Sequence, residues 1–426
     1  MSTVFIDKLR KLTEPEYFRF FLIPRARIRQ YWYIHKIQKS GHARIVFLVC
    51  SVPMWRSQSL YERLQKDPRF SVSIAYYPTH RLTANSQLEN ERRDLCDFFL
   101  KKKIPLLDLS KEDSPGHVLR QSLNPDIIFY PQPYNHLFWN DLDNQFFGDK
   151  LVCYIPYGTL VSQCPWLDQG LLNNTAWRIF CHSNSRKQQA AAVLFNHGRN
   201  IKVTGDPFYD LFKRPTDHTA WKEQKWKKKR VIWAPHHSVH DKDLFHHNSF
   251  MWLHETMLKL ADIYQDKIQF SFKPHPLLFK SLCEIPEWGE KRTKEYYRIW
   301  RDGENTQLDL GSYIDLFKGS DAMIHDSASF TAEYLLTRNP VLFATKELPF
   351  IMNQSNSLGK EALSAHYICD SELGVVDFIE NTVLGGKDQL KNIRTSFFQK
   401  HFSSIERQSA AENIFFELIT DLGFDK

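Results

Sequence analysis

Alternating apolar and polar stretches between residues 43 and 205 predict a series of parallel strands separated by helices. Residues 43–50 (ARIVFLVC) form an uninterrupted apolar run, as expected of a strand that is buried on both faces of a sheet. A stretch with helical spacing follows at 57–65, and a second apolar run lies at 70–77. Further strands are predicted at 104–109, 126–131, 150–156, 177–183 and 200–205, with a charged helix around 86–103. This order is typical of a doubly wound α/β domain.

A second series of the same kind begins after a polar and basic stretch at 205–230. It predicts strands at 230–235, 268–274, 321–325 and 340–344, and helices near 249–264, 311–318, 328–337 and 409–423. Two consecutive Rossmann-like domains facing a cleft are the architecture of GT-B glycosyltransferases, and ligands in such folds lie at the carboxyl ends of the strands. We therefore expect an N-terminal acceptor domain at 44–207 and a C-terminal donor-nucleotide domain at 208–426. The last helix is a candidate to pack back on the N-terminal domain.

Residues 1–43 form a separate helical appendage in this interpretation. Its segment 18–39 interleaves aromatic residues with arginine and lysine around Pro24. Such a segment suits an anionic membrane surface. The alternative is a helix that packs on the N-terminal domain with its basic face in water.

Composition narrows the class of protein. The 426 residues carry a net charge of +7, which suits a phosphorylated ligand or an anionic surface, and no nucleic-acid-binding motif accompanies it. The seven cysteines form no C-x-x-C pair, so buried free thiols in a reducing compartment are the simplest interpretation. With neither a signal-peptide pattern nor an apolar run of about 18 residues, we expect a cytoplasmic protein, peripheral at most on the inner face of the membrane.

Chemically active side chains follow three strands of the second series. Because the carboxyl ends of parallel strands meet at one sheet edge, these loops should lie together. Histidines, a lysine and hydroxyls there can bind a pyrophosphate and stabilise charge on a departing phosphate. The helix that begins after Ser329 adds amide groups suited to an anion. The residues are His236, His237 and Ser238 after the first strand, Lys273 and His275 after the second, and Asp326, Ser327 and Ser329 after the third.

Other residues of the predicted cleft allow two interpretations. Glu333 is placed to accept a ribose hydroxyl, or to complement a helix dipole. In the first domain, Tyr157, Gly158 and Thr159 follow a buried strand. Tyr157 is a candidate catalytic residue, and Gly158 and Thr159 are assigned to the acceptor side. Ser183 and Ser185 precede a helical segment, where a helix cap is the favoured role.

A metal site is the main alternative for the histidine-rich loop. Residues 236–247 contain five histidines and two aspartates, but zinc needs three or four convergent ligands, and we predict no metal or other cofactor. The D-x-D triplets at 141–143 and 241–243 are common by chance. The sequence has no P-loop, no G-x-G-x-x-G and no G-x-S-x-G motif, which disfavours a P-loop ATPase, a standard dinucleotide site and an α/β-hydrolase.

The ordered motifs resemble the CDP-glycerol glycerophosphotransferase family, the GT-B-like teichoic acid and capsule polymerases. They are PYGT (156–159), HSNS (182–185), VTGDPFYD (203–210), WAPHHS (233–238), FKPHP (272–276) and HDSAS (325–329) followed by NPVLF (339–343). The resemblance implies that His275 contacts the donor pyrophosphate and stabilises the leaving CMP. It also implies that Ser327 and Ser329 bind the donor phosphates and that Asp326 orders their turn.

Three motifs depart from the family pattern. Near the C-terminus, IERQSAAE (405–412) replaces an acidic-Gly element. Tyr157 stands where the family typically has the histidine that acts as base, and a tyrosine with a pKa near 10 is a poor base at neutral pH. Pro235-His236-His237-Ser238 replaces a Pro-Thr-x-Arg element. We therefore expect a retained donor-phosphate site and a rebuilt base, with His236 or His237 as base or as a second phosphate ligand.

The expected function is transfer of a polyol phosphate, such as glycerol phosphate, from a CDP-activated donor to a glycan or lipid-linked glycan acceptor during cell-envelope polysaccharide synthesis. The alternatives are a GT-B glycosyltransferase that uses a nucleotide sugar, and a non-catalytic nucleotide- or glycan-binding subunit. The released nucleotide distinguishes the three: CMP, UDP or GDP, or none.

Overall fold

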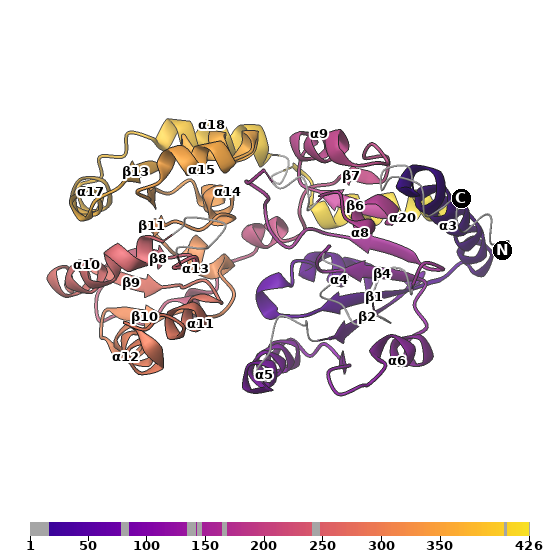
Figure 1. The fold of residues 1–426 in the computed structure, drawn as a ribbon, viewed down its shortest axis with the longest axis horizontal. Coiled ribbons are helices and arrows are strands. Elements are labelled where there is room, and N and C mark those ends of the chain that lie inside the picture. The colour runs from indigo at the N-terminus through magenta and orange to yellow at the C-terminus, as the bar shows by residue number, and fades with distance from the viewer. Residues whose placement is uncertain are drawn as a thin grey trace. The chain divides into compact units, whose positions relative to one another are not determined.

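The computed structural model describes residues 17–77, 85–133, 142, 147–163, 168–240, 248–403 and 407–425, without the side chains of 85–87. The chain forms two compact units. The first comprises Met1–Gly158, Cys164–Leu211 and Ser404–Lys426, and the second comprises Thr159–Gln163 and Phe212–Ser403. Each contains one parallel sheet with helices packed around it (Figure 1). The α/β fold class predicted from the sequence is confirmed.

The first unit contains a sheet of order β3-β2-β1-β4-β5-β6-β7, and every pair of described neighbouring strands is parallel. Its strands are β1 (Ala43–Val49), β2 (Phe70–Tyr76), β3 (Leu106–Asp108), β4 (Ile127–Tyr130), β5 (Leu151–Tyr154), β6 (Arg178–Cys181) and β7 (Ile201–Val203). Its helices are α3 (Ile23–Ser40), α4 (Gln58–Leu64), α5 (Asn85–Lys101), α6 (Pro115–Ser122), α8 (Leu171–Thr175), α9 (Asn184–Val193) and α20 (Ala410–Leu422).

Burial on both faces explains the continuous apolar run of β1. Ile45 and Phe47 point into one hydrophobic core, and Val46 and Leu48 into the other. The Phe47 ring stacks on that of Phe129 in the neighbouring strand, with ring centroids 4.5 Å apart. Alternate side chains therefore pack against helices on opposite faces of the sheet, and polar residues are disfavoured on both faces.

The C-terminal helix α20 packs in the first unit, against α4 among other elements. Asp210 binds the N-terminus of this helix. Its carboxylate accepts hydrogen bonds from the N–H groups of Ala410 and Ala411 at 2.9 Å and from the Ser409 hydroxyl at 2.8 Å. A carboxylate at a helix N-terminus satisfies amides that have no partner within the helix and complements the helix dipole. The last residue of the GDPFYD motif therefore anchors the end of the chain.

The N-terminal helix α3 has one buried and one exposed face. On the buried face, the Gln30 amide donates to the Thr175 carbonyl at 2.8 Å and the Tyr33 hydroxyl donates to Asp126 at 3.0 Å. On the exposed face, Trp32 is 68% exposed and Tyr31 is 59% exposed. The helix thus packs on the first unit, as the alternative interpretation predicted, and still presents aromatic residues to solvent. No helix in the described part of the chain is both long and apolar enough to cross a membrane.

The second unit contains a parallel sheet of order β10-β9-β8-β11-β12-β13. Its strands are β8 (Lys229–Ala234), β9 (Ile268–Phe272), β10 (Thr306–Leu308), β11 (Ala322–His325), β12 (Val341–Ala344) and β13 (Tyr367–Cys369). The described α-helices of this unit are α10 (Ser249–Ile263), α11 (Leu278–Cys283), α12 (Gly289–Asp302), α13 (Ile314–Lys318), α14 (Phe330–Glu333), α15 (Leu348–Gln354), α16 (Ser357–Leu363), α17 (Glu372–Asp377) and α18 (Lys391–His401).

The direction of strand order reverses between β8 and β11, which pair with each other in the middle of this sheet. Strands β9 and β10 follow on one side of that point, and β12 and β13 on the other. In open α/β sheets, ligands bind at such a switch point, beyond the carboxyl ends of the strands. The fold therefore places the ends of β8, β9 and β11 where a ligand is expected.

Candidate functional site

The three loops singled out in the sequence lie at adjacent strand ends. His236 and His237 follow β8, His275 follows β9, and Asp326 follows β11. Because β9, β8 and β11 are consecutive in the sheet, the loops share one edge. The His275 N–H donates to the Pro235 carbonyl at 3.0 Å, which joins two of the loops directly.

Asp326 joins the third loop to the first. Its carboxylate accepts the His236 N–H at 2.6 Å and the Ser249 N–H, in the first turn of α10, at 2.7 Å. Burial raises the pKa of Asp326 to about 6, although both hydrogen bonds favour the charged form. Asp326 thus orders the β8 loop and the start of α10 together.

Three imidazoles gather at this edge. The ring centroids of His236 and His237 are 4.3 Å apart, those of His237 and His275 are 4.2 Å apart, and those of His236 and His275 are 4.9 Å apart. One nitrogen from each lies within 4.8 Å of the others, so the group could hold a metal ion. Ser238 lies beside them, with its hydroxyl 2.8 Å from Nδ1 of His236. The cluster is suited to an anion or to a metal, depending on which nitrogens carry protons.

A fourth histidine, His325, is buried at the end of β11 and pairs with His366. Their Nε2 atoms are 3.2 Å apart, and Nδ1 of His366 lies 2.8 Å from the Ala362 carbonyl oxygen. Burial lowers the pKa of His366 to about 4, so this ring is neutral near pH 7. Sequence reasoning missed His366, because it directly precedes β13, a short strand with no clear apolar pattern.

Lys273 is already engaged within the second unit. Its ammonium donates to Asp309 at 2.8 Å and to the Gly311 carbonyl at 2.7 Å, and its side chain is 8% exposed. These contacts join β9 to the loop that follows β10. The predicted contact of Lys273 with donor phosphates stays a prediction, and Asp309 is a partner that sequence reasoning missed.

The turn after β11 differs from the simple helix start expected. The Ser327 N–H donates to Nδ1 of His325 at 3.1 Å, and the Ser327 carbonyl accepts from the Thr331 hydroxyl at 3.0 Å. Ser329 precedes α14, a single turn that continues as a 3₁₀ turn at Tyr334–Thr337. Because α14 is short, its dipole would contribute little to the binding of an anion. Most of the binding would then have to come from side chains and individual amides.

Glu333 holds another segment of the second unit. One carboxylate oxygen accepts both the N–H of Thr159 at 3.0 Å and its hydroxyl at 3.1 Å, and the other accepts the Tyr313 hydroxyl at 2.6 Å. The side chain is fully buried. These hydrogen bonds give Glu333 a structural role that was not predicted from the sequence. Its predicted contact with a ribose stays a prediction.

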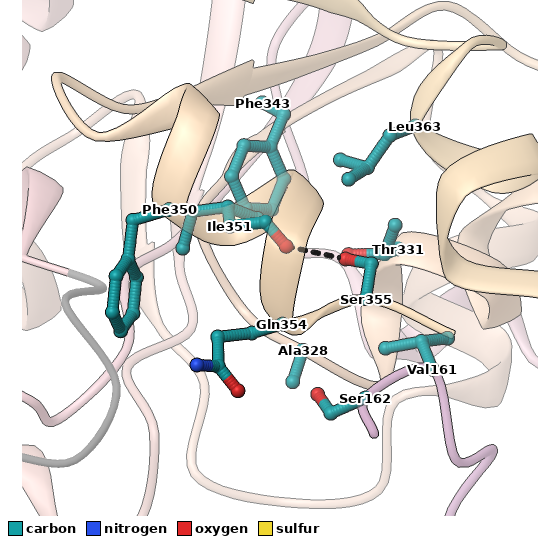
Figure 2. Close-up of a pocket in the computed structure, with 10 residues that line it drawn as sticks. All are labelled: Val161, Ser162, Ala328, Thr331, Phe343, Phe350, Ile351, Gln354, Ser355 and Leu363. Carbon is teal, nitrogen blue, oxygen red and sulfur yellow. Dashed lines mark hydrogen bonds between the residues drawn. The ribbon is translucent and has the colours of Figure 1, made fainter. Parts of the chain in front are cut away.

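A pocket adjoins the turn on the side of Ala328. Ser162, Ala328 and Gln354 lie at one end of it, and Phe343 and Leu363 lie at the other (Figure 2). The Ser355 hydroxyl, which also lines it, donates to the Ile351 carbonyl at 2.7 Å. The other lining residues are Val161, Thr331, Phe350 and Ile351. None of the strand-end histidines lines this pocket, so it is separate from the imidazole cluster.

The remaining predicted residues lie at the boundary between the units in the chain. Tyr157 and Gly158 belong to the first unit and are half-buried, whereas Thr159 belongs to the second. Arg56 contacts the Tyr157 carbonyl at 3.4 Å and forms a buried ion pair with Asp206 at 2.7 Å. Ser183 caps α9 by accepting the Arg186 N–H at 3.2 Å, as predicted. The acidic residues of both D-x-D triplets lie outside the described residues.

Comparison with known proteins identifies the family. The family model for CDP-Glycerol:Poly(glycerophosphate) glycerophosphotransferase matches residues 161–412, more than half of the chain. This range includes every strand-end residue of the second unit described above. None of the curated proteins matches the chain by sequence.

Solved structures with low sequence identity share the fold. The wall teichoic acid polymerase TagF superposes with a TM-score of 0.60 at 12% identity, covering 93% of this chain and 93% of that chain. The UDP-GlcNAc 2-epimerase from Neisseria meningitidis, bound to UDP-GlcNAc, superposes with a TM-score of 0.58 at 14% identity, covering 88% of this chain and 100% of that one. Together with the family match, these findings confirm the resemblance predicted from the motifs: the chain belongs to the CDP-glycerol:poly(glycerophosphate) glycerophosphotransferase family.

Proposed function

We propose that this protein transfers glycerol phosphate from CDP-glycerol to a hydroxyl group of a growing cell-wall polymer. The observation that carries the proposal is the cluster of His236, His237 and His275, tied to Asp326 at the switch point of the unit that the family model matches. Imidazoles at such a position suit a pyrophosphate ligand. A structure of TagF was obtained after a soak with CDPG, which supports a CDP-linked donor in this family.

The reaction is a displacement at the phosphorus atom that carries glycerol. The acceptor oxygen attacks this atom, the bond to the bridging oxygen breaks, and CMP leaves with that electron pair. The proton of the acceptor hydroxyl passes to a base. His275 donates to the donor phosphates and stabilises charge on the leaving CMP, while Ser327 and Ser329 contact the same phosphates. No metal enters the proposed mechanism.

We assign the base to the second unit. Tyr157 is a poor proton acceptor near neutral pH, which favours a strand-end imidazole instead. His236 and His237 were both candidates from the sequence, and their rings lie against that of His275. The acceptor is proposed to be a glycan or a lipid-linked glycan, with Gly158 and Thr159 as candidate acceptor-side residues.

We further propose that α3 places the enzyme on the cytoplasmic face of the membrane. Between residues 17 and 61 the chain has no Asp or Glu, and residues 17–42 carry six Arg or Lys. Exposed Phe20, Ile28, Tyr31 and Trp32 lie among these cations. Aromatic and basic residues on one exposed face suit the interface of an anionic bilayer. None of the described cysteines forms a disulfide bond, which is compatible with a reducing compartment.

Identification of the released nucleotide tests this function. The purified protein and an acceptor polymer are incubated with one donor at a time: CDP-glycerol, a UDP-sugar or a GDP-sugar. We expect CMP release from CDP-glycerol alone, with one glycerol phosphate added to the polymer per CMP. Release of UDP or GDP instead identifies a nucleotide-sugar glycosyltransferase, and release of no nucleotide identifies a binding subunit.

A further inference from the structure

Three histidines at the strand ends share one local hydrogen bond. In each, Nδ1 accepts the backbone N–H of the residue two positions further on. The distances are 3.3 Å from Ser238 to His236, 3.2 Å from Leu277 to His275, and 3.1 Å from Ser327 to His325. The same contact thus recurs on the adjacent strands β8, β9 and β11.

This contact determines where each ring carries its proton. A backbone N–H only donates, so the nitrogen that accepts it must present a lone pair. A neutral imidazole with a lone pair on Nδ1 carries its hydrogen on Nε2. Protonation of Nδ1 would place two N–H groups against each other, so the contact also disfavours the charged imidazolium.

The His325–His366 pair provides an internal check. A carbonyl oxygen only accepts, so Nδ1 of His366 carries a hydrogen toward Ala362 and its Nε2 presents a lone pair. The 3.2 Å contact between the two Nε2 atoms then requires that His325 donates from Nε2. The Ser327 N–H at Nδ1 of His325 demands the same tautomer, so two independent contacts agree.

We propose that the amides of Ser238 and Leu277 lock His236 and His275 as Nε2–H tautomers, so that both are neutral hydrogen-bond donors to a phosphate. The lock itself belongs to the free protein. Only the identity of the anion rests on the proposed function. In this tautomer the Ser238 hydroxyl, 2.8 Å from Nδ1 of His236, also donates to that nitrogen.

Two consequences follow for the chemistry of the cluster. His236 has its Nδ1 lone pair engaged and a hydrogen on Nε2, so it binds phosphate and is not the general base, which leaves His237. Metal binding through Nε2 of His236 or His275 would require the opposite tautomer and the loss of a backbone hydrogen bond. The cluster therefore prefers an anion to a zinc ion, although the spacing of its nitrogens suits either.

The direct test is the tautomer of each ring in the free protein. Long-range ¹H–¹⁵N correlation of ¹⁵N-histidine-labelled protein at pH 7.5 distinguishes protonated from unprotonated ring nitrogens, with resonances assigned from single His→Gln variants. We expect unprotonated Nδ1 and protonated Nε2 in His236, His275 and His325. The opposite pattern in His236 or His275 overturns the proposal, whether or not the protein releases CMP.

A pair of substitutions tests the role of the Nε2–H group. The amide nitrogen of glutamine can replace Nε2, whereas asparagine reaches only as far as Nδ1. We expect His275→Asn to weaken the binding of inorganic pyrophosphate by roughly 10- to 100-fold, as for a lost hydrogen bond to a charged group. His275→Gln should retain most of the affinity. Equal losses in two variants that melt at the wild-type temperature would contradict the donor role.

Zinc binding tests the same proposal from the other side, because zinc needs ring nitrogens that present lone pairs. Titration of the free protein with Zn²⁺ is compared between the wild type and a variant with His236, His237 and His275 all changed to Gln. We expect equal Zn²⁺ binding by the two proteins. A tight site that is present only in the wild type would show that the cluster presents lone pairs, and the proposal would then be wrong.

Discussion

At the scale of single residues, Asp326 links the parts of the candidate site. Its carboxylate receives amides from the β8 loop and from the start of α10, and it directly follows the buried His325. A buried carboxylate is costly unless such donors satisfy it. Burial nevertheless outweighs the two hydrogen bonds and raises its pKa to about 6. Asp326 therefore fixes the geometry of the site at a cost in stability that depends on pH.

The sign of this dependence gives a first prediction. The pKa of Asp326 is higher in the folded state than in the unfolded state. Between about pH 4 and 6 the folded protein therefore keeps a proton on Asp326 that the unfolded chain has lost, and stability falls as pH rises through this range. The shift corresponds to about 3 kcal/mol at most. Asp326→Asn should remove this slope. Urea unfolding of both proteins from pH 4 to pH 7 measures it.

His366 acts in the opposite direction, because its lowered pKa makes the fold lose stability as pH falls from about 6.5 toward 4. The difference between the wild type and Asp326→Asn at each pH removes this common contribution. A difference that is constant from pH 4 to pH 7 would show that Asp326 has an ordinary pKa.

At the scale of elements, the segment Thr159–Gln163 is held on the second unit by several independent contacts. The Asn356 amide donates to the Leu160 carbonyl at 2.9 Å, and its oxygen accepts the Gly359 N–H at 2.9 Å at the start of α16. Glu333 holds Thr159 through its N–H and hydroxyl. The chain between the two units is therefore fixed at its second-unit end.

Gly359 supplies the second prediction, because α16 approaches this segment without a side chain between them. A Cβ at Gly359 would lie 2.2 Å from the Val161 carbonyl oxygen. Gly359→Ala should displace the segment and lower the free energy of unfolding by about 1–3 kcal/mol. At Gly311 a Cβ meets nothing within 4 Å, so Gly311→Ala is the matched control, with an expected change within about 0.5 kcal/mol. Equal effects of the two substitutions in urea unfolding would contradict the close approach.

The sequence predicted the buried parallel strands well, and it predicted short or polar elements poorly. The runs at 43–50 and 268–274 correspond to β1 and β9, because burial on both faces requires continuous apolar residues. The three-residue strands β10 and β13 have no such run and were missed. The helix predicted at 328–337 is α14 followed by a 3₁₀ turn, a distinction that hydrophobic spacing does not make.

The candidate site was predictable in its position and only partly in its contacts. Motifs at strand ends indicated His236, His275 and Asp326, since strand order determines which loops meet. The partners of Lys273 and Glu333 depend on residues far along the chain, namely Asp309 and Thr159. A charged residue in a motif does not reveal whether it faces a ligand or another side chain.

At the scale of the whole molecule, the proposed donor site lies in the second unit, and α3, which we propose contacts the membrane, lies in the first. The exposed aromatic residues of α3 give the third prediction. Changing both Tyr31 and Trp32 to Ser should reduce co-sedimentation with vesicles of anionic lipid by more than tenfold, because both side chains are largely exposed. Leu373 is 80% exposed and belongs to the second unit, so Leu373→Ser is the control and should bind as the wild type does.

Charge should contribute to this binding as well. Each cation near an anionic surface adds about 1 kcal/mol, so binding of the wild type should weaken as salt rises and should be absent with zwitterionic vesicles. Wild-type binding that is indifferent to lipid charge, or that survives loss of both aromatic residues, would contradict a role for α3 at the membrane.

CMP release by His275→Ala shows whether the strand-end imidazoles of the second unit support transfer from CDP-glycerol. The rate is measured with an acceptor polymer, beside the wild type and His218→Ala, an exposed histidine outside the cluster. We predict that His275→Ala keeps the wild-type melting temperature and loses roughly 100- to 1000-fold in rate, as for a lost donor to a developing charge. His218→Ala should match the wild type. Near-wild-type CMP release by folded His275→Ala would contradict the account.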